Sequence, residues 1–80
     1  MATVKDTVLE YVQKEVFPDQ RITYDTPLIT GLGGHSLVMA GVKTYLEKLY
    51  RIRIPDEMAT REAFDSVENI TRLLGKLGVR

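Results

Sequence analysis

A glycine-rich segment, residues 31–34, runs directly into an apolar helical pattern and most restricts the fold of this 80-residue chain. Glycine adopts backbone conformations that other residues resist, so the chain can turn sharply there. Apolar residues then recur at helical spacing from Leu37 to Leu49. Ser36 therefore stands where a loop becomes a helix, beside backbone N–H groups that attract negative charge and can hold a phosphate. Its hydroxyl is a candidate N-cap, nucleophile or attachment point for a phosphate-linked group.

Two further helical patterns flank this segment. A first helix is predicted from Thr3 to Phe17, because Thr3 and Asp6 resemble a capping box and Pro18 ends the pattern. A last helix is predicted from about Val67 to Gly78, with Asp65 or Ser66 as its N-cap and Gly78 as a C-cap signal. A short helical turn is expected between Asp56 and Phe64.

The stretch from Asp19 to His35 shows no helical pattern and is predicted as a long ordered loop, pinned to the core by its spaced apolar residues. The helix predicted over Ser36–Tyr50 has a separate apolar side. Its expected core residues are Val38, Val42, Tyr45, Leu46 and Leu49. Gly41 costs about 1 kcal/mol relative to alanine inside a helix, so it indicates a close helix contact.

These patterns together predict an all-α fold: a small right-handed bundle of four helices, three long and one short, forming a single domain over residues 1–80. Lys plus Arg and Asp plus Glu are equal at 11 each, which gives no bulk charge for nucleic acid or a membrane. The chain has no cysteine, so its core must hold by packing alone, as suits a cytoplasmic protein. No apolar run approaches the roughly 18 residues that span a membrane.

Catalytic and metal chemistry find little support in these residues. His35 neighbours Ser36, but no third group is singled out to orient the imidazole, and the serine-elbow pattern requires glycine where this chain has Val38. One histidine without cysteine makes no metal site. A nucleotide-binding loop requires lysine before the Ser or Thr that follows its glycines, which His35 does not supply. The basic residues around the predicted helix 36–50 are interrupted by an acid and lack an aromatic platform.

Three segments resemble the phosphopantetheine-dependent carrier proteins, which are the acyl and peptidyl carriers of fatty-acid, polyketide and nonribosomal-peptide synthesis. They are Asp25-Thr26-Pro27-Leu28, Gly33-Gly34-His35-Ser36-Leu37 and Ile54-Pro55-Asp56-Glu57. The segment around Ser36 is similar to the attachment motif of peptidyl carriers, whereas the segment that begins at Ile54 is more similar to an acyl carrier. The likeness extends from about Thr3 to Leu77 in helix order and loop length.

The resemblance implies a non-catalytic carrier with 4′-phosphopantetheine, derived from coenzyme A, esterified to Ser36. It implies that acyl or aminoacyl cargo is held as a thioester, and the peptidyl-type motif favours aminoacyl cargo. His35 occupies a place where acyl carriers commonly have Asp and is expected to shape the turn or touch partners. The implied partners are a phosphopantetheinyl transferase, an adenylation enzyme or acyltransferase, and polyketide synthase modules. A stand-alone monomer of polyketide or nonribosomal-peptide biosynthesis is expected.

The predicted helix 36–50 departs from the acidic helix of fatty-acid carriers. Its one acid, Glu47, is flanked by Lys43, Lys48 and Arg51. We expect partners to contact this helix at His35, Leu37, Ala40, Lys43, Glu47 and Arg51. Glu47 is expected to pair with a cation on a partner, and an intrahelical Lys43–Glu47 pair worth about 0.2–0.5 kcal/mol is the alternative. Two other functions stay open, an unmodified helical interaction module and a fatty-acid carrier.

Overall fold

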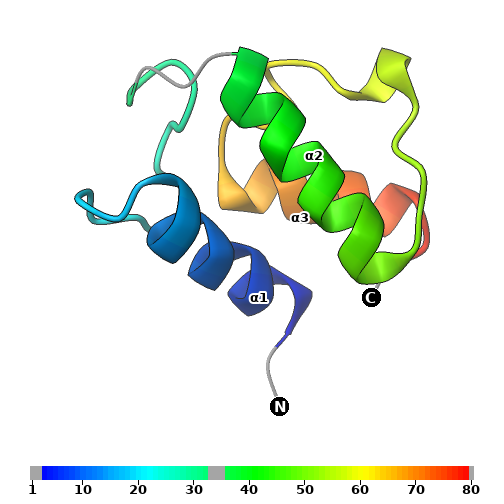
Figure 1. Cartoon of the computed structure of the whole chain (residues 1–80), viewed down its shortest axis with the longest axis horizontal. Helices are drawn as coiled ribbons and strands as arrows, with labels where there is room; N and C mark the ends of the chain where they lie inside the picture. The colour runs from blue at the N-terminus through cyan, green and yellow to red at the C-terminus, as the bar shows by residue number, and fades with distance from the viewer. Residues whose placement is uncertain (1–2, 33–35, 80) are drawn as a thin grey trace.

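The computed structural model describes residues 3–32 and 36–79, and all of its regular elements in this part of the chain are helical (Figure 1). They are α1 (Val4–Tyr11), the wider turn η1 (Val12–Val16), α2 (Ser36–Tyr50), the single tight turn η2 (Asp56–Met58) and α3 (Val67–Lys76). Since α1 and η1 are continuous, the structure confirms an all-α fold with three main helices and one short one. No described helix is long and apolar enough to cross a membrane.

The core forms where the three helices and the intervening segments meet, with α3 passing behind α2 (Figure 1). Its most completely buried side chains come from α1, η1, α2, α3 and the segment after α2. They are Val8, Val12, Leu46, Ile54, Val67, Ile70 and Leu74. Burying one such side chain stabilises the fold by about 1.5–3 kcal/mol, so this cluster is the main source of stability in a chain without disulfides.

Local caps fix the helix ends much as the sequence predicts. The Thr3 hydroxyl oxygen accepts a hydrogen bond from the backbone N–H of Asp6 at 3.1 Å. Ser66 caps α3, since its hydroxyl accepts from the N–H of Asn69 at 3.0 Å. At the other end of α3, Gly78 adopts a φ of 87°, and the N–H of Val79 reaches back to a carbonyl of α3. This arrangement is a Schellman motif, which favours glycine.

The loop between η1 and α2 is ordered over residues 17–32, as predicted, and its apolar side chains Ile22, Leu28 and Ile29 are buried. Gln13 is half-buried and anchors the start of this loop. Its amide oxygen accepts from the N–H of Ile22 at 2.8 Å, while its amide nitrogen donates to carbonyls of the loop. The part of the prediction that concerns residues 33–35 lies outside the described residues.

Two predictions about α2 are wrong. Leu49 is 43% exposed, although its helical angle matches that of Val42 and Leu46. Leu49 is exposed because it lies in the last turn of α2, where Tyr50 packs against the core in its place. Gly41 makes no close helix contact, because no atom outside its own helix backbone lies within 4 Å of a Cβ built there.

Gly41→Ala is therefore expected to raise the free energy of unfolding by up to about 1 kcal/mol, because alanine keeps the helix and meets open space. Urea denaturation of the variant and of the wild type measures the difference. Gly78→Ala is the matched control: its positive φ makes alanine strained, so the same substitution should destabilise by about 1 kcal/mol. A loss of stability in Gly41→Ala would contradict this picture of α2.

Candidate functional site

Ser36 is the first residue of α2, as the sequence predicts. The first turn of α2 contains no acidic residue, so no carboxylate in that turn would repel an anion. An anion beside Ser36 would meet the positive end of the helix dipole. Gly33, Gly34 and His35 lie outside the described residues, and the expected role of His35 stays a prediction.

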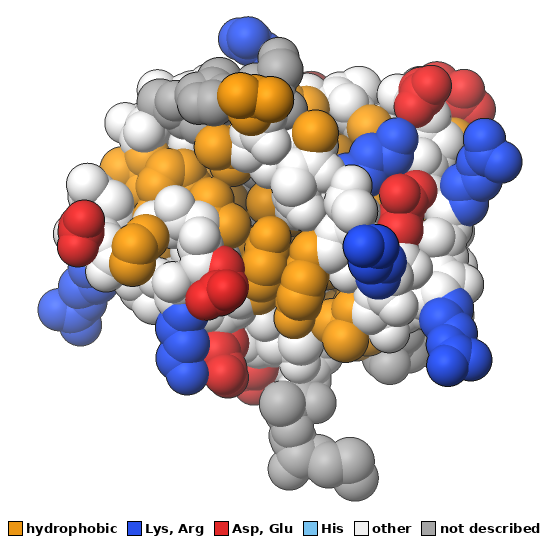
Figure 2. Space-filling model, viewed as in Figure 1, with side chains coloured by type: hydrophobic (Ala, Val, Ile, Leu, Met, Phe, Trp, Pro, Cys, Tyr) orange, Lys and Arg blue, Asp and Glu red, His pale blue; other side chains and the backbone are white. Residues whose placement is uncertain are grey.

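The surface beside Ser36 is apolar and open. Leu37 is 78% exposed, and Ala40, one turn further along α2, is also exposed. Figure 2 shows apolar side chains gathered over the start of α2 and between α1 and α2. Between those two helices, the rings of Tyr11 and Tyr45 stack with centroids 3.7 Å apart. The start of α2 thus presents exposed apolar side chains for contact with another protein.

Lys43 and Glu47 have structural partners in the segment that follows α2. The Lys43 Nζ lies 3.0 Å from Oδ1 of Asp56, and the hydrogen bond and charge of Lys43 lower the pKa of that carboxyl. The Glu47 Oε2 accepts a hydrogen bond from the backbone N–H of Ile54 at 2.8 Å. The predicted intrahelical Lys43–Glu47 pair is therefore wrong, because each side chain reaches forward to residues 54–56.

The expected partner-facing residues are not all brought together. Leu37 and Ala40 lie in the first turns of α2, whereas Arg51 follows its last residue in an unusual left-handed conformation with φ of 54°. Fifteen residues of α-helix span about 22 Å, so Arg51 lies a whole helix length away from Ser36. Among the expected contact residues that the structure describes, Leu37 and Ala40 are the ones that lie near Ser36 along the helix.

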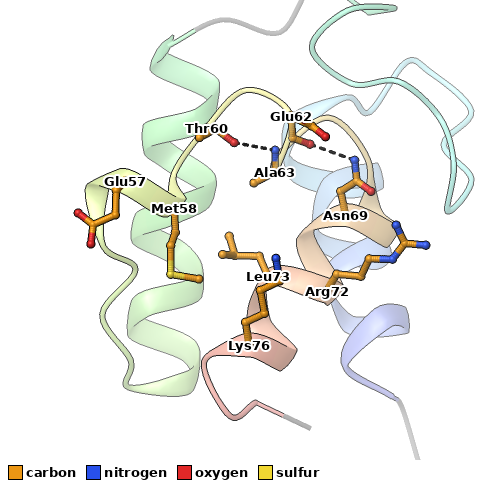
Figure 3. A pocket seen from close by; sticks show the side chains of 9 residues that line it. All are labelled: Glu57, Met58, Thr60, Glu62, Ala63, Asn69, Arg72, Leu73 and Lys76. Carbon is orange, nitrogen blue, oxygen red and sulfur yellow. Dashed lines mark hydrogen bonds between the residues drawn. The ribbon is translucent and has the colours of Figure 1, made fainter.

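A surface hollow of about 370 Å³ lies between η2 and α3 (Figure 3). Met58 and Leu73 point toward one another across it. Its rim combines two acids and two bases, Glu57, Glu62, Arg72 and Lys76. Thr60 and Asn69 are both engaged in local hydrogen bonds, to Ala63 and Glu62. This mixture is typical of a solvated surface and identifies no reacting group.

Asp65 has a role that sequence reasoning missed. Its Oδ1 accepts from the N–H groups of Ile29 at 2.7 Å and Thr30 at 2.9 Å, and its Oδ2 accepts from the Thr30 hydroxyl at 3.0 Å. Its own carbonyl accepts from the N–H of Leu28 at 2.6 Å. We call these four hydrogen bonds the Asp65 latch. They join residues more than 30 positions apart, so no local pattern signals them.

A model of the phosphopantetheine attachment site family matches residues 4–74. The chain belongs to this family. The predicted kinship with phosphopantetheine-dependent carrier proteins is thereby confirmed, and the prosthetic group of the family is covalently attached 4′-phosphopantetheine. Neither the curated proteins nor the solved structures contain a match to this carrier.

The start of α2 fits the family's prosthetic group. A phosphodiester is an anion, and it would meet the positive end of the helix dipole at a first turn without acidic residues. The exposure of Leu37 shows that this helix end lies at the surface, where a long arm can extend. The carrier therefore satisfies the electrostatic and the steric requirement on the described residues.

Glu47 offers a test that separates its structural contact from contact with a partner enzyme. Glu47→Ala leaves the N–H of Ile54 without its acceptor and is expected to lower the free energy of unfolding by about 1–2 kcal/mol. Glu47→Gln keeps an oxygen acceptor, so its stability should stay within about 0.5 kcal/mol of the wild type. Chemical denaturation compares the two, and equal losses of stability would refute the assigned contact. Glu47→Gln removes the charge but keeps the contact with Ile54. A slower transfer of cargo to this variant than to the wild type would therefore indicate that Glu47 pairs with a cation on the partner.

Proposed function

We propose that this carrier bears 4′-phosphopantetheine on Ser36 and holds acyl or aminoacyl intermediates as thioesters for polyketide or nonribosomal-peptide biosynthesis. The observation that carries the proposal is that Ser36 opens α2 within the matched region. The chain's other serine, Ser66, is buried and caps α3. Ser36 thus combines a hydroxyl with a place at the start of a helix that has no acidic residue in its first turn, next to the exposed Leu37.

In the attachment step, the Ser36 oxygen bonds to the β-phosphorus of coenzyme A and loses its proton, while 3′-phosphoadenosine 5′-phosphate leaves. A transferase supplies the catalysis, and the carrier supplies the hydroxyl and the docking surface. The terminal thiol of the bound arm holds cargo as a thioester. Tethering raises the effective concentration of cargo at each partner, so a non-catalytic protein suffices.

The charge of α2 supports a role outside primary fatty-acid synthesis. Its one acid, Glu47, already accepts a hydrogen bond from Ile54, and the chain carries no net charge. Partners would meet an apolar surface at Leu37 and Ala40. The proposed partners are a phosphopantetheinyl transferase, an adenylation enzyme or acyltransferase, and polyketide synthase modules. The carrier would act as a cytoplasmic monomer, and the peptidyl-type sequence around Ser36 favours aminoacyl cargo.

The absence of cysteine provides a direct assay, because any thiol must come from the prosthetic group. The carrier is incubated with coenzyme A and a promiscuous phosphopantetheinyl transferase, freed of small molecules, and titrated with a thiol reagent. The thiol content is expected to rise from zero to one per chain. A separate incubation with an aminoacyl-coenzyme A should give a loaded carrier that hydroxylamine cleaves. A thiol content that stays at zero would favour the unmodified interaction module.

A further inference from the structure

The turn that precedes Ser36 is compact and packed against the core. The carbonyl of Pro27 accepts hydrogen bonds from the N–H groups of Gly31 and Leu32, each at 3.1 Å. A Cβ added to Gly31 would lie 2.5 Å from Pro27 Cγ and 2.6 Å from the Pro27 carbonyl oxygen, so the turn closes only with glycine there. Leu32 packs against the core cluster. Residues 27–32 therefore form one closely packed, hydrogen-bonded unit, which we call the Pro27–Leu32 turn.

The Asp65 latch holds this turn against the start of α3. Three of its hydrogen bonds end on one carboxylate, and bonds to an ionised acceptor are stronger than neutral ones. Partial burial pushes the pKa of Asp65 upward, but the hydrogen bonds from Thr30 and Ile29 outweigh it and lower the pKa below its usual value. The carboxylate is thus charged at neutral pH and remains a full acceptor.

We propose that Asp65 is a positioning residue for the modification of Ser36, an inference that rests on the proposed attachment there. Only residues 33–35 separate Leu32 from Ser36, and four chain steps reach at most about 14 Å. The position of the latched turn therefore limits how far Ser36, which a transferase must approach, can lie from Leu32. Without the latch, the enzyme has to order the Pro27–Leu32 turn when it binds. Fixing the backbone of even one released residue costs about tenfold in affinity.

The test measures modification kinetics of the full chain with coenzyme A and a promiscuous transferase. Asp65→Ala removes three hydrogen bonds of the latch, so KM for the carrier should rise about tenfold while kcat stays within about twofold. Asp65→Asn should restore KM to within about twofold of the wild type. Its amide oxygen can accept from both N–H groups, and its amide nitrogen can donate to the Thr30 hydroxyl. Amide hydrogen exchange should accelerate at Ile29 and Thr30 in the alanine variant only.

Ser66→Ala is the matched control, since it weakens the same end of α3 without touching the Pro27–Leu32 turn. An equal rise in KM for Asp65→Ala and Ser66→Ala, or no rise in either, would overturn the positioning role. A second pair of variants serves if Asp65→Ala does not fold. Thr30→Val removes the hydrogen bond from the exposed Thr30 hydroxyl to Asp65 and should raise KM about threefold. Thr30→Ser keeps the hydroxyl and should leave KM unchanged. Equal KM values for that pair would also overturn it. A wild type that is never modified would instead refute the attachment at Ser36.

Discussion

Leu46→Ala is expected to lower the free energy of unfolding by about 2–5 kcal/mol, because it removes a completely buried side chain from the centre of α2. Leu46 belongs to the cluster that joins α2 to α1 and α3, and the cavity left behind adds to the lost burial. Domains of this kind have a total stability of about 5–15 kcal/mol, so the variant should be largely destabilised. Urea unfolding followed by circular dichroism at 25 °C measures the loss.

Leu49→Ala is the matched control for this prediction. The same residue type is truncated on the same helix, three positions further on, but Leu49 is 43% exposed. Its loss should stay below about 1 kcal/mol, since no comparable cavity forms. Equal losses in the two variants would contradict the burial of α2 described above.

Gly31→Ala is expected to lower the free energy of unfolding by about 1–3 kcal/mol, because the added methyl group overlaps the ring and the carbonyl oxygen of Pro27. Neither group is the flexible end of a long side chain, so the Pro27–Leu32 turn itself must shift. Ile29 and Thr30 belong to this turn, so the shift should weaken their hydrogen bonds to Asp65 and accelerate their amide hydrogen exchange.

Gly75→Ala is the control for Gly31→Ala, since a Cβ at that position of α3 has no atom within 4 Å outside its own helix backbone. Alanine there should stabilise the protein by up to about 1 kcal/mol. A Gly31→Ala variant as stable as the wild type would show that the turn can open without cost, and the positioning role of Asp65 would then lose its basis.

Local sequence signals predicted much of this fold. The bounds of α2, the Thr3 and Ser66 caps and the C-terminal signal of Gly78 all depend on residues within a few positions of each other. Their physics is the pairing of helix-end backbone groups, which short-range patterns describe well. The helical period likewise identified Val42 and Leu46 as core residues.

The errors arose where distant segments decide the outcome. Helical angle alone cannot tell that Tyr50, rather than Leu49, packs against the core in the last turn of α2. The partners of Lys43 and Glu47 depend on how the chain folds back after α2. In the sequence, Asp65 and Ser66 fit the capping pattern equally well. Asp65 instead accepts a hydrogen bond from the N–H of Thr30, which lies far away in the sequence.

In the candidate site, too, local sequence predicts one feature and tertiary contacts decide another. The position of Ser36 at the start of a helix follows from the glycines and the apolar period, and the structure confirms it. The predicted partner surface along α2 depends on tertiary contacts. The structure gives Lys43 and Glu47 internal contacts and leaves Leu37 and Ala40 exposed beside Ser36.

The intact mass of three proteins, measured after incubation with coenzyme A and a promiscuous phosphopantetheinyl transferase, shows directly whether Ser36 carries the prosthetic group. The wild type should gain the mass of one phosphopantetheine group and Ser36→Ala should gain none. Ser66→Ala removes the chain's other serine hydroxyl and costs about 1 kcal/mol in capping, yet it should gain the same mass as the wild type. A mass gain that persists in Ser36→Ala, or that disappears only in Ser66→Ala, would contradict attachment at Ser36.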